Sequence, residues 1–563
     1  MERFWLKSYP PDVPAEIDTS EYRSLKDLCE RHCHEFPERV AYVQMGHAMT
    51  YGELESASRA FAAWLQQSAG LEKGERIAIM LPNVLQYPVA MFGALRAGLT
   101  VVNTNPLYTA HELEHQLSDS GAQAIVILEN FAHVLEEVIA RTSVRTVIVT
   151  GAGDLLGPVK GAIVNAVVRH VRRQVPAWHI AGATRFATVL ARGHQLSLRE
   201  IEIDNEDIAF LQYTGGTTGV SKGAVLTHRN LTCNARQGLA WFGKHLPIGA
   251  TYVLALPLYH IFSLTGNCLM FMCVGARGIM ITNPRDFRGF VRELKKYPPN
   301  FFLGVNTLFN ALLHTPGFDE IDFTGLTGTV GGGMAVQRTV AEQWHQRTGC
   351  VLGQGWGLTE TSPIACMNPL GEDFNGSIGL PVPSTEISIR SDEGRDLGVE
   401  AIGEICVRGP QVMREYWKRP DETANVMLPD GWLRTGDIGH IDARGYVFIE
   451  DRKKDMIVVS GFNVYPNEVE SAAVSHPGVL EAAAVAQPDE KSGESVALFV
   501  VRKDPHLTAE ALIAHCRKSL TGYKVPKHVY FRSELPKTNV GKILRKALRD
   551  EVNQHPFTRQ STS

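Results

Sequence analysis

The chain has 563 residues, which is too long for one ordinary domain and predicts two to four domains. Hydrophobic residues make up 44% and charged residues 21% of the sequence, which excludes a disordered or low-complexity protein. The 56 basic and 60 acidic side chains give a formal net charge of −4, so the overall charge gives no argument for a nucleic-acid partner.

Nine cysteines are spread along the chain without any C-x-x-C pair. This arrangement predicts reduced thiols in a cytosolic protein rather than a disulfide or zinc framework. The N-terminal stretch MERFWLKSYPPDVP has no long apolar core and is not expected to be a signal peptide. The most apolar run, Ile261–Ala276, is shorter than the ~20 residues of a membrane-spanning helix, and we expect a buried helix there.

From about Leu25 to Leu380, helical patterns alternate with short β-branched runs. This alternation is typical of α/β layers with largely parallel sheets. The clearest predicted helices are Tyr51–Gln66 and Ala110–Ser118, and the clearest strands are Arg76–Met80, Leu99–Asn103, Ala124–Leu128 and Thr146–Thr150.

Between Gly379 and Glu450 the runs are separated by Gly, Pro and Asp turns, which predicts a β-rich subdomain. Its expected strands are Glu386–Arg390, Gly403–Arg408 and Gly445–Glu450. The charged cluster DRKKD at Asp451–Asp455 is expected to interrupt the strands and to begin a second domain. We therefore predict a large N-terminal domain, 1–450, and a small α+β domain, 451–563. The elements expected in the small domain are strands Met456–Val459, Val479–Val485 and Ser495–Val501 and helices Asn467–Ser475 and Thr508–Leu520.

A basic amphipathic pattern occupies Pro158–Arg173. Its apolar residues lie at helical spacing, and five basic side chains lie beside them: Lys160, Arg169, His170, Arg172 and Arg173. Such a helix can lie on an anionic membrane surface, here the cytoplasmic face of the inner membrane. The alternative is a surface helix that packs on its own domain.

A stretch dense in Gly, Thr and Lys follows the apolar run that ends at Tyr213. Glycine lets the backbone approach phosphate groups, threonine hydroxyls add donors and Lys222 adds a positive charge. The spacing does not fit G-x-x-x-x-G-K-[ST], which disfavours an ordinary P-loop NTPase. We predict a triphosphate-binding loop that contains Tyr213, Thr214, Gly215, Gly216, Thr217, Thr218, Gly219 and Lys222.

The run YTGGTTGVSKGA, 213–224, resembles the first signature of the adenylate-forming superfamily, which includes acyl-CoA synthetases, adenylation domains and beetle luciferases. Further signatures follow in the expected order along nearly the whole chain. The family often has Pro where Ser221 stands and Ser or Thr where Gly215 stands, and neither change removes a charge. The resemblance implies that ATP activates a carboxylic acid, with Mg²⁺ held near Thr214 and Glu360.

The run GQGWGLTET, 353–361, resembles a second signature of the family. The ring of Trp356 can stack on adenine, Thr359 can donate to the α-phosphate, and the Glu360 carboxylate suits Mg²⁺. The family usually has Tyr where Trp356 stands, so a hydrogen bond from a phenol is lost. The resemblance places the turn of Gly331, Gly332 and Gly333 at the adenine and acyl sites, and a helix is expected to follow at Ala335–Arg347. Gly357, in the second signature, is also expected to bind the nucleotide.

Three later positions complete the implied nucleotide site. WLRTGDI, 432–438, resembles the motif whose aspartate holds the ribose hydroxyls, which assigns this role to Asp437. Arg452 matches the arginine that also reaches the ribose. PKTNVGKILR, 536–545, resembles the signature with the catalytic lysine, which maps to Lys542 and stabilises charge that develops at the α-phosphate.

The resemblance also implies that the small domain rotates between two half-reactions about a hinge at Lys454. Rotation would withdraw Lys542 and present Gly461, beside which the pantetheine arm of coenzyme A would pass. His260, in PLYHIF, has two interpretations: a core histidine with a satisfied partner, or a residue near the acyl carboxylate.

Longer matches resemble the bacterial long-chain fatty acyl-CoA synthetases, among them LPNVLQYPVAMFGALRAG (81–98) and DRKKDMIVVSGFNVYPNEVE (451–470). They imply an AMP-forming ligase that uses a medium- or long-chain fatty acid, ATP and coenzyme A and has no carrier-protein domain. Apolar side chains in Val305–Leu313 are expected to line an acyl tunnel. The alternatives are an adenylating enzyme for an aryl or short acid, a non-enzymatic acyl-AMP-binding regulator, and a membrane protein that transports fatty acids.

Overall fold

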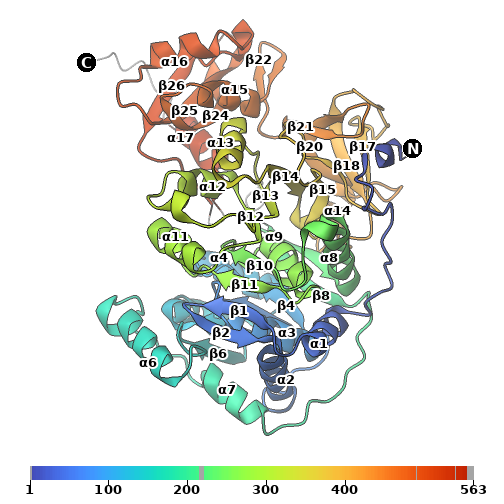
Figure 1. Ribbon diagram of the computed structural model, residues 1–563, viewed down its shortest axis with the longest axis vertical. Coiled ribbons are helices and arrows are strands. Elements are labelled where there is room, and N and C mark those ends of the chain that lie inside the picture. Colours follow the sequence, from blue (N-terminus) through green and yellow to red (C-terminus); the bar gives the residue numbers. More distant parts are fainter. Residues whose placement is uncertain (1–2, 215–220, 490, 539–540, 555–563) are drawn as a thin grey trace.

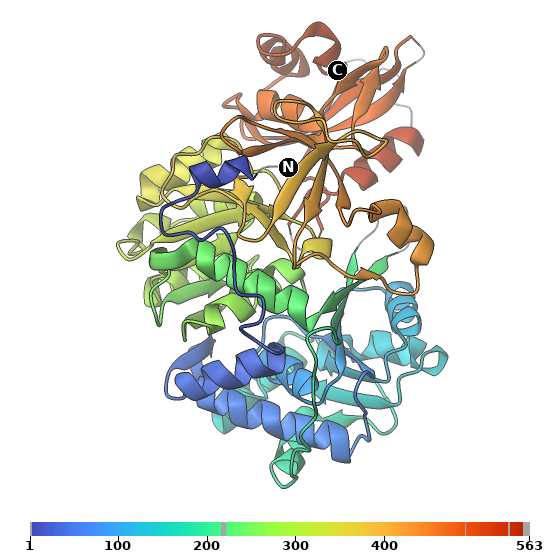
Figure 2. The ribbon, with the colours of Figure 1, turned by 90° about the vertical axis from the view of Figure 1, so that its right-hand side faces the viewer.

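The computed structural model describes residues 3–214, 221–489, 491–538 and 541–554. Helices α1 (Leu25–Glu35) and α2 (Tyr51–Gln67) lie at one end of the long axis and the C-terminal residues form a separate body at the other end (Figure 1). A central body and a β-rich body lie between them, and the turned view shows the same stacking (Figure 2). This arrangement confirms the predicted α/β fold with a β-rich subdomain and a small C-terminal α+β body.

Eight strands of the described residues form one sheet in the order β19-β9-β8-β4-β3-β5-β6-β7. The pairings from β8 to β7 are parallel, and β9 and β19 add antiparallel pairings at one edge. The strands are β3 (Arg76–Met80), β4 (Thr100–Asn103), β5 (Ala124–Leu128), β6 (Thr146–Thr150), β7 (Thr184–Arg185), β8 (Ile208–Thr214), β9 (Lys222–Thr227) and β19 (Glu415–Tyr416).

Capping residues explain where two of the predicted helices begin. Thr50 and Glu53 form a capping box before α2, and Thr109 and Glu112 form one before α4. The helices of this part of the chain are α1 (Leu25–Glu35), α2 (Tyr51–Gln67), α3 (Gln86–Arg96), α4 (Ala110–Ser120), α5 (Ala132–Val138), α6 (Pro158–Ala166) and α7 (Phe186–Gly193).

A second sheet of the described residues has the strand order β16-β15-β14-β13-β12-β10-β11-β1-β2, mostly parallel in its centre. Its strands are β1 (Val40–Gln44), β2 (His47–Thr50), β10 (Thr251–Leu254), β11 (Arg277–Met280), β12 (Phe301–Gly304), β13 (Gly328–Gly332), β14 (Leu352–Gly357), β15 (Ile364–Met367) and β16 (Leu380–Pro381). The accompanying helices are α8 (His228–Phe242), α11 (Phe287–Lys296), α12 (Asn306–Leu313) and α13 (Arg338–Thr348).

The apolar run at 261–276 forms the buried helix that was expected. It consists of α9 (Ile261–Ser263), a π-helical segment η6 (Leu264–Leu269) and α10 (Met270–Met272), all of them buried except the partly buried Phe262. In the described part of the chain, none of the helices has both the length and the apolar character needed to cross a bilayer.

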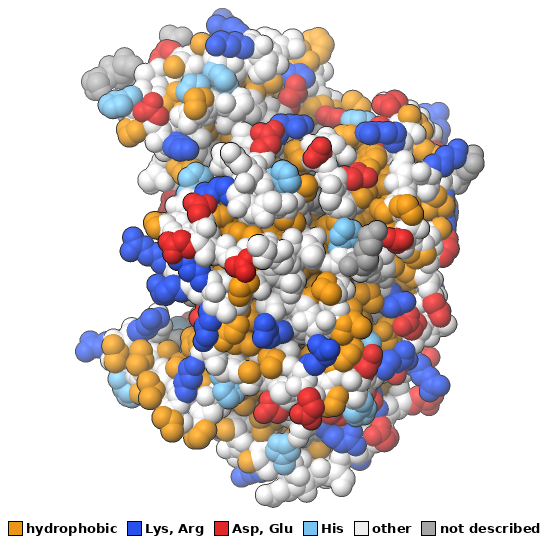
Figure 3. Space-filling model, in the orientation of Figure 1, with side chains coloured by type: hydrophobic (Ala, Val, Ile, Leu, Met, Phe, Trp, Pro, Cys, Tyr) orange, Lys and Arg blue, Asp and Glu red, His pale blue; other side chains and the backbone are white. Residues whose placement is uncertain are grey.

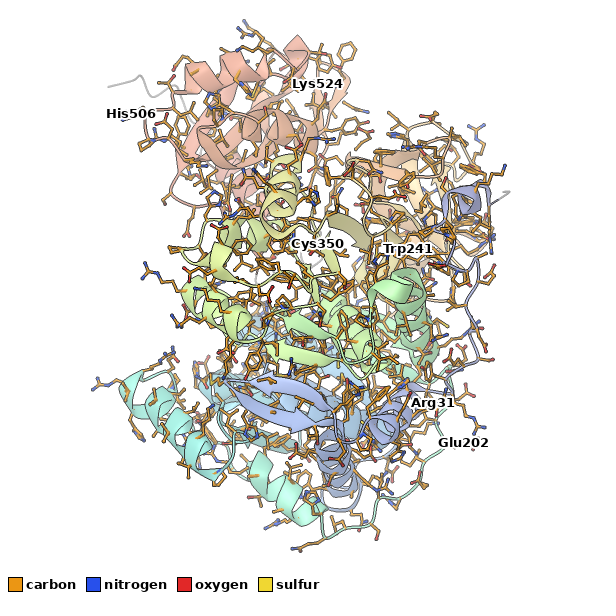
Figure 4. All side chains as sticks on the ribbon, viewed as in Figure 1. Arg31, Glu202, Trp241, Cys350, His506 and Lys524 are labelled. Atoms are coloured by element: carbon orange, nitrogen blue, oxygen red, sulfur yellow. The ribbon has the colours of Figure 1, made fainter. Side chains whose placement is uncertain are left out.

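The β-rich subdomain is a four-stranded antiparallel sheet in the order β17-β18-β20-β21. Trp241, near the end of α8, lies where this subdomain meets the central body (Figure 4), and its indole Nε1 donates to the Asn368 carbonyl over 3.1 Å. The elements are β17 (Glu386–Arg390), β18 (Gly403–Arg408), α14 (Pro420–Val426), β20 (Leu433–Ile441) and β21 (Val447–Arg452).

The C-terminal body is a mixed sheet of β22 to β26 covered by α15, α16 and α17. The DRKKD cluster does interrupt the strands, but two residues later than Asp451, because β21 continues through Arg452 by pairing with β20 and the turn occupies 453–455. The elements are β22 (Ile457–Val459), β23 (Phe462–Val464), α15 (Pro466–Val474), β24 (Val479–Asp489), β25 (Gly493–Arg502), α16 (Ala509–Cys516), β26 (His528–Arg532) and α17 (Arg545–Gln554).

The helix expected at Ala335 begins three residues later, at Arg338. The preceding backbone is held by side chains instead of helical hydrogen bonds. Val336 N donates to Gln354 Oε1, and Gln337 N donates to Asn306 Oδ1. Those two side-chain acceptors come from β14 and α12, so local sequence periodicity does not record them.

Candidate functional site

The two strands that flank the predicted phosphate loop are antiparallel neighbours, β8 and β9. Tyr213 and Thr214 end β8, and Lys222 begins β9. The Tyr213 hydroxyl donates to Asp119 Oδ2 over 2.6 Å, which fixes the start of the loop against the end of α4. The predicted phosphate-binding residues Gly215, Gly216, Thr217, Thr218 and Gly219 lie outside the described residues.

The ammonium group of Lys222 lies in a cluster of charged and aromatic side chains. Its Nζ is 2.5 Å from Glu422 Oε2 and 5.1 Å from the centre of the Tyr416 ring. The Tyr416 hydroxyl donates to Glu360 Oε1 over 2.6 Å. Burial and the Glu360 carboxylate raise the pKa of Tyr416, so the phenol stays protonated and keeps donating.

Glu360 and Thr359 belong to a short 3-10 turn after β14. One Glu360 carboxylate oxygen accepts from Tyr416, and both Glu360 and Thr359 are only partly buried. Within the described ranges, no group of three or more His, Cys, Asp or Glu side chains could hold a metal ion. A single carboxylate fits Mg²⁺ that is bound mostly through substrate phosphates and water rather than in a protein cage.

A buried carboxylate lies at the predicted ribose site. Asp437 on β20 is 2% exposed, and its Oδ2 accepts from Trp356 Nε1 over 2.9 Å. Its Oδ1 lies 2.8 Å from Arg452 Nε, but the geometry is not that of a hydrogen bond and this oxygen has no other hydrogen-bond partner. The unsatisfied Oδ1 fits an acceptor for a ligand hydroxyl. Trp356 was predicted only to stack on adenine, and its hydrogen bond to Asp437 is an additional contact.

The predicted nucleotide-site glycines Gly332, Gly333 and Gly357 lie in different backbone environments. Gly332 is the last residue of β13 rather than part of a turn, and Gly333 has a φ of +75°. A Cβ on Gly333 would lie 2.9 Å from Lys542 Cε, so the glycine makes room for the lysine. A Cβ on Gly357 would lie 1.6 Å from the Pro363 carbonyl oxygen, so Gly357 is required by packing within the chain.

Lys542 reaches this site from the C-terminal body. Its segment is held by a hydrogen bond from Thr307 Oγ1 on α12 to the Gly541 carbonyl, over 3.1 Å. Burial and the nearby Arg452 cation lower the pKa of Lys542 to about 8, although the Asp437 and Glu360 carboxylates oppose this shift. Lys542 therefore lies among the predicted ribose, metal and acyl residues.

His260 precedes α9, where its Nδ1 accepts from Phe262 N over 3.3 Å. Burial and the Lys542 cation lower the pKa of His260 to about 3, so the ring is neutral at physiological pH. Both interpretations of His260 remain compatible with this geometry, since the ring has a local partner and also lies near Lys542.

The predicted hinge residue Lys454 follows β21. Its carbonyl accepts from Arg549 Nη1 over 3.0 Å, and the same guanidinium nitrogen donates to Asp455 over 2.9 Å. Arg549 belongs to α17, which begins three residues after Lys542. Gly461 is exposed, has a φ of +85° and has nothing within 4 Å of the position of a Cβ. It lies in the turn between β22 and β23.

Sequence reasoning missed three residues that hold the site together: Asp119, Tyr416 and Glu422. Asp119 joins Tyr213 to Arg419, whose Nη2 donates to Asp119 Oδ1 over 2.6 Å. Tyr416 lies in β19, which joins the edge of the phosphate-loop sheet although it is almost 200 residues further along the chain. Glu422 lies in α14, which follows β19. Only the pairing of β19 with β9 brings them near Lys222, and a short two-residue strand leaves no periodic signal.

The expected acyl tunnel along Val305–Leu313 is not supported for most of its apolar residues. Leu308, Phe309, Leu312 and Leu313 pack into the hydrophobic core of the central body. The Phe309 ring lies 4.8 Å from the Trp344 ring. These side chains face the core because α12 packs against α13.

Comparisons with known proteins agree with this geometry. A family model described as "AMP-binding enzyme" matches residues 29–417, and one described as "AMP-binding enzyme C-terminal domain" matches residues 468–542.

A long-chain-fatty-acid–CoA ligase from Yersinia pestis is 56% identical over 98% of both chains, and one from Bacillus subtilis is 38% identical over 98% of both. Among solved structures, the anthranilate CoA ligase AuaEII in complex with anthranoyl-AMP has a TM-score of 0.84 at 25% identity. That match covers 95% of this chain and 99% of the other.

Proposed function

The chain belongs to the AMP-binding enzyme family, and on that premise we propose that it is a long-chain-fatty-acid–CoA ligase. The observation that carries this proposal is that Lys542 of the C-terminal body lies near Asp437 and Glu360 of the N-terminal part of the chain. The full-length similarity to ligases of that name supports fatty acid, ATP and coenzyme A as substrates.

In the first half-reaction, the fatty-acid carboxylate attacks the α-phosphorus of ATP and pyrophosphate leaves. Lys542 places its positive charge where charge builds on the phosphoryl oxygens. Asp437 Oδ1 and Arg452 hold the ribose, and the Trp356 ring contributes an aromatic face to the adenine site. Lys222 holds the β- and γ-phosphates. Glu360, with the Thr214 hydroxyl, would hold Mg²⁺, which neutralises phosphate charge when it is bound.

In the second half-reaction, the thiolate of coenzyme A attacks the acyl carbon, forms the thioester and displaces AMP. We infer that residues 451–563 rotate about Lys454 between the two steps, so that Gly461 replaces Lys542 at the site. The exposure of Gly461 and the position of Lys542 beside Gly333 and near Asp437 and Glu360 support a structure in the adenylate-forming arrangement.

The test of the assigned lysine separates the two half-reactions. Lys542→Ala should lower the rate of acyl-adenylate formation by about 10²–10³, as loss of an oxyanion-stabilising group does. Thioester formation from supplied acyl-AMP should be largely kept. An equal fall in both half-reactions would contradict the role of Lys542.

The substrate class is tested with the purified protein, ATP, coenzyme A and acids of increasing chain length. We expect turnover of C12–C18 acids. Strong turnover of acetate or benzoate beside weak turnover of long chains would instead favour the alternative of an adenylating enzyme for short or aryl acids.

We also propose that α6 and the following π-helical turn η4 (Val167–Val171) contact the cytoplasmic face of the membrane. Val159, Ile163 and Val171 are 73%, 59% and 76% exposed, so the apolar face of this segment is not used for packing. Figure 3 shows hydrophobic side chains along the projecting segment at the lower left, bordered by basic ones. Arg169 is not free for lipid, because it forms an ion pair with Glu129 over 2.8 Å.

The membrane contact is tested by sedimentation with vesicles. The protein should bind vesicles that contain anionic lipid more strongly than neutral ones, and Val159→Ser with Ile163→Ser should lower this binding several-fold. Ile248→Ser removes another exposed apolar side chain, 65% exposed, and should leave vesicle binding unchanged. Equal binding by all variants would refute the contact.

A further inference from the structure

Lys222, the lysine that the proposed function assigns to the leaving phosphates, already forms an ion pair with Glu422. The Nζ–Oε2 distance is 2.5 Å, and the lysine side chain is 17% exposed while that of Glu422 is 43% exposed. Lys222 also lies over the Tyr416 ring. The ammonium group is therefore neutralised before any nucleotide arrives.

The backbone fixes Glu422 relative to Lys222. β19 pairs with β9 through Tyr416 opposite Ala224, and Trp417 N donates to the Gly223 carbonyl over 2.8 Å. Tyr416 N in turn donates to Thr423 Oγ1 over 2.9 Å, which holds α14 against the strand. The strand pairing and the helix contact therefore hold the backbones of both residues at fixed positions, so the ion pair does not depend on side-chain flexibility alone.

Electrostatics gives this pair a consequence for nucleotide binding. The β- and γ-phosphates of ATP, or pyrophosphate, must share or replace the carboxylate at Lys222, and the freed carboxylate then faces their negative charge. Glu360 adds a second carboxylate nearby, and one of its two oxygens accepts a hydrogen bond from the Tyr416 hydroxyl. AMP carries only the α-phosphate, so it does not meet this competition.

We propose that Glu422 is an internal competitor for Lys222 that weakens the binding of ATP and pyrophosphate but not of AMP. This inference rests on the proposed function, since it takes Lys222 as the residue that holds the leaving phosphates. Glu422 acts through Lys222 and is an affinity-setting residue rather than a catalytic one. Glu422 favours the release of pyrophosphate, because the ion pair between its carboxylate and Lys222 forms again when the product dissociates.

The test is the affinity of the full-length protein for ATP, pyrophosphate and AMP, measured by calorimetry with Mg²⁺ present. Glu422→Gln keeps the shape of the side chain and should tighten ATP and pyrophosphate binding by about twofold to fivefold, the range expected for a partly exposed charge pair. AMP binding should not change. Glu422→Ala, a second variant, should give the same direction.

Asp421→Asn is the matched control, because it removes one negative charge from the neighbouring, exposed position of the same helix. It should leave all three affinities unchanged. Unchanged or weaker ATP binding by Glu422→Gln would overturn the proposal. Tighter binding of AMP to the same degree would also overturn it, because AMP does not reach Lys222.

Lys222→Ala separates failure of this inference from failure of the proposed site. That variant should bind ATP more weakly and AMP normally, and if it does not, the phosphate role of Lys222 is wrong. Adding Glu422→Gln to Lys222→Ala should give a smaller gain than it gives alone. An equal gain would mean simple repulsion by Glu422 rather than competition for the lysine.

Discussion

At the scale of single residues, the Trp356–Asp437 hydrogen bond joins the residue expected at the adenine site to the residue expected at the ribose site. A phenol at position 356 would place its hydroxyl differently from an indole Nε1. The indole satisfies one oxygen of a nearly fully buried carboxylate and leaves the other for a ligand. Trp356 therefore fixes the orientation of the Asp437 carboxylate.

Trp356→Phe should lower the free energy of unfolding by about 1–3 kcal/mol, because it leaves a buried carboxylate oxygen without a donor. It should also weaken AMP binding, because Asp437 loses its fixed orientation. Urea unfolding and AMP calorimetry measure the two effects. Trp241→Phe removes another buried indole hydrogen bond, in this case to the backbone carbonyl of Asn368. This control should change stability alone, and an equal loss of AMP affinity would contradict the orienting role of Trp356.

The lowered pKa of Lys542 predicts a pH dependence of adenylation. The lysine must be protonated to stabilise phosphate charge, and in the free enzyme its pKa is lowered to about 8. The kcat/KM for acyl-adenylate formation should therefore fall as the pH rises through about 8, since this parameter reports the free enzyme. Pyrophosphate exchange between pH 6 and 10 measures it. Lys542→Arg keeps the charge at high pH, so its residual activity should lack this decline. A flat profile for the parent enzyme would refute the protonation requirement.

Sequence motifs predicted the identity of the residues that meet at Lys542, because each lies in a short run with a recognisable composition. They did not predict Asp119, Tyr416 or Glu422, whose positions depend on a sheet edge assembled from segments almost 200 residues apart. The pKa of Lys542 was equally out of reach, since it depends on burial that only the folded chain creates.

At the scale of elements, α6 is attached to its domain by small and polar residues rather than by its apolar face. Asn165 accepts from Gly153 N and donates to Asp154, both over 2.8 Å. A Cβ on Gly161 would lie 2.4 Å from the Gly153 carbonyl oxygen. The helix therefore packs closely through Gly161 and Asn165, with Val164 against the core, while Val159 and Ile163 remain exposed.

Gly161→Ala should loosen α6 without unfolding the protein, because the added methyl collides with the Gly153 backbone. Hydrogen exchange of residues 158–171 should become faster, while exchange in β5 and β6 should stay slow. Ala162→Gln adds atoms at the neighbouring exposed position at little cost in helix propensity, and it should leave exchange unchanged. If exchange were equally fast in both variants, the close approach at Gly161 would not be what holds the helix.

Local periodicity predicted most element boundaries to within a few residues, since strands such as β3, β5 and β6 are bounded by clear turns. It failed where distant contacts decide the ends. β21 extends through Arg452 because β20 pairs with it, and α13 starts late because side chains of Gln354 and Asn306 hold the residues before it.

At the scale of the whole molecule, the contact between Thr307 and Gly541 joins the central body to the segment that carries Lys542. A Cβ on Gly541 would lie 3.0 Å from Thr307 Oγ1, close enough for a disulfide between cysteines at both positions, and the φ of +82° at Gly541 means that the new cysteine also strains the loop. Oxidised Thr307→Cys/Gly541→Cys should form acyl-adenylate but should not pass it to coenzyme A. A reductant should restore thioester formation.

The two single-cysteine variants, oxidised in the same way, are the controls for this cross-link. The native cysteines are free and, except for the partly buried Cys350, buried, so they should not react first. Full thioester formation by the oxidised double variant would show that the small domain need not leave this position.

The anchoring of the hinge bears on how this protein could be recombined with its relatives. Asp451 accepts from Asn467 N over 2.8 Å, and Asp455 pairs with Arg549 of α17. A chimera joined after Asp455 would take these carboxylates from one parent and their partners from the other. A junction before Asp451 keeps each set together, so the exchangeable module begins within strand β21 rather than in the loop that follows it.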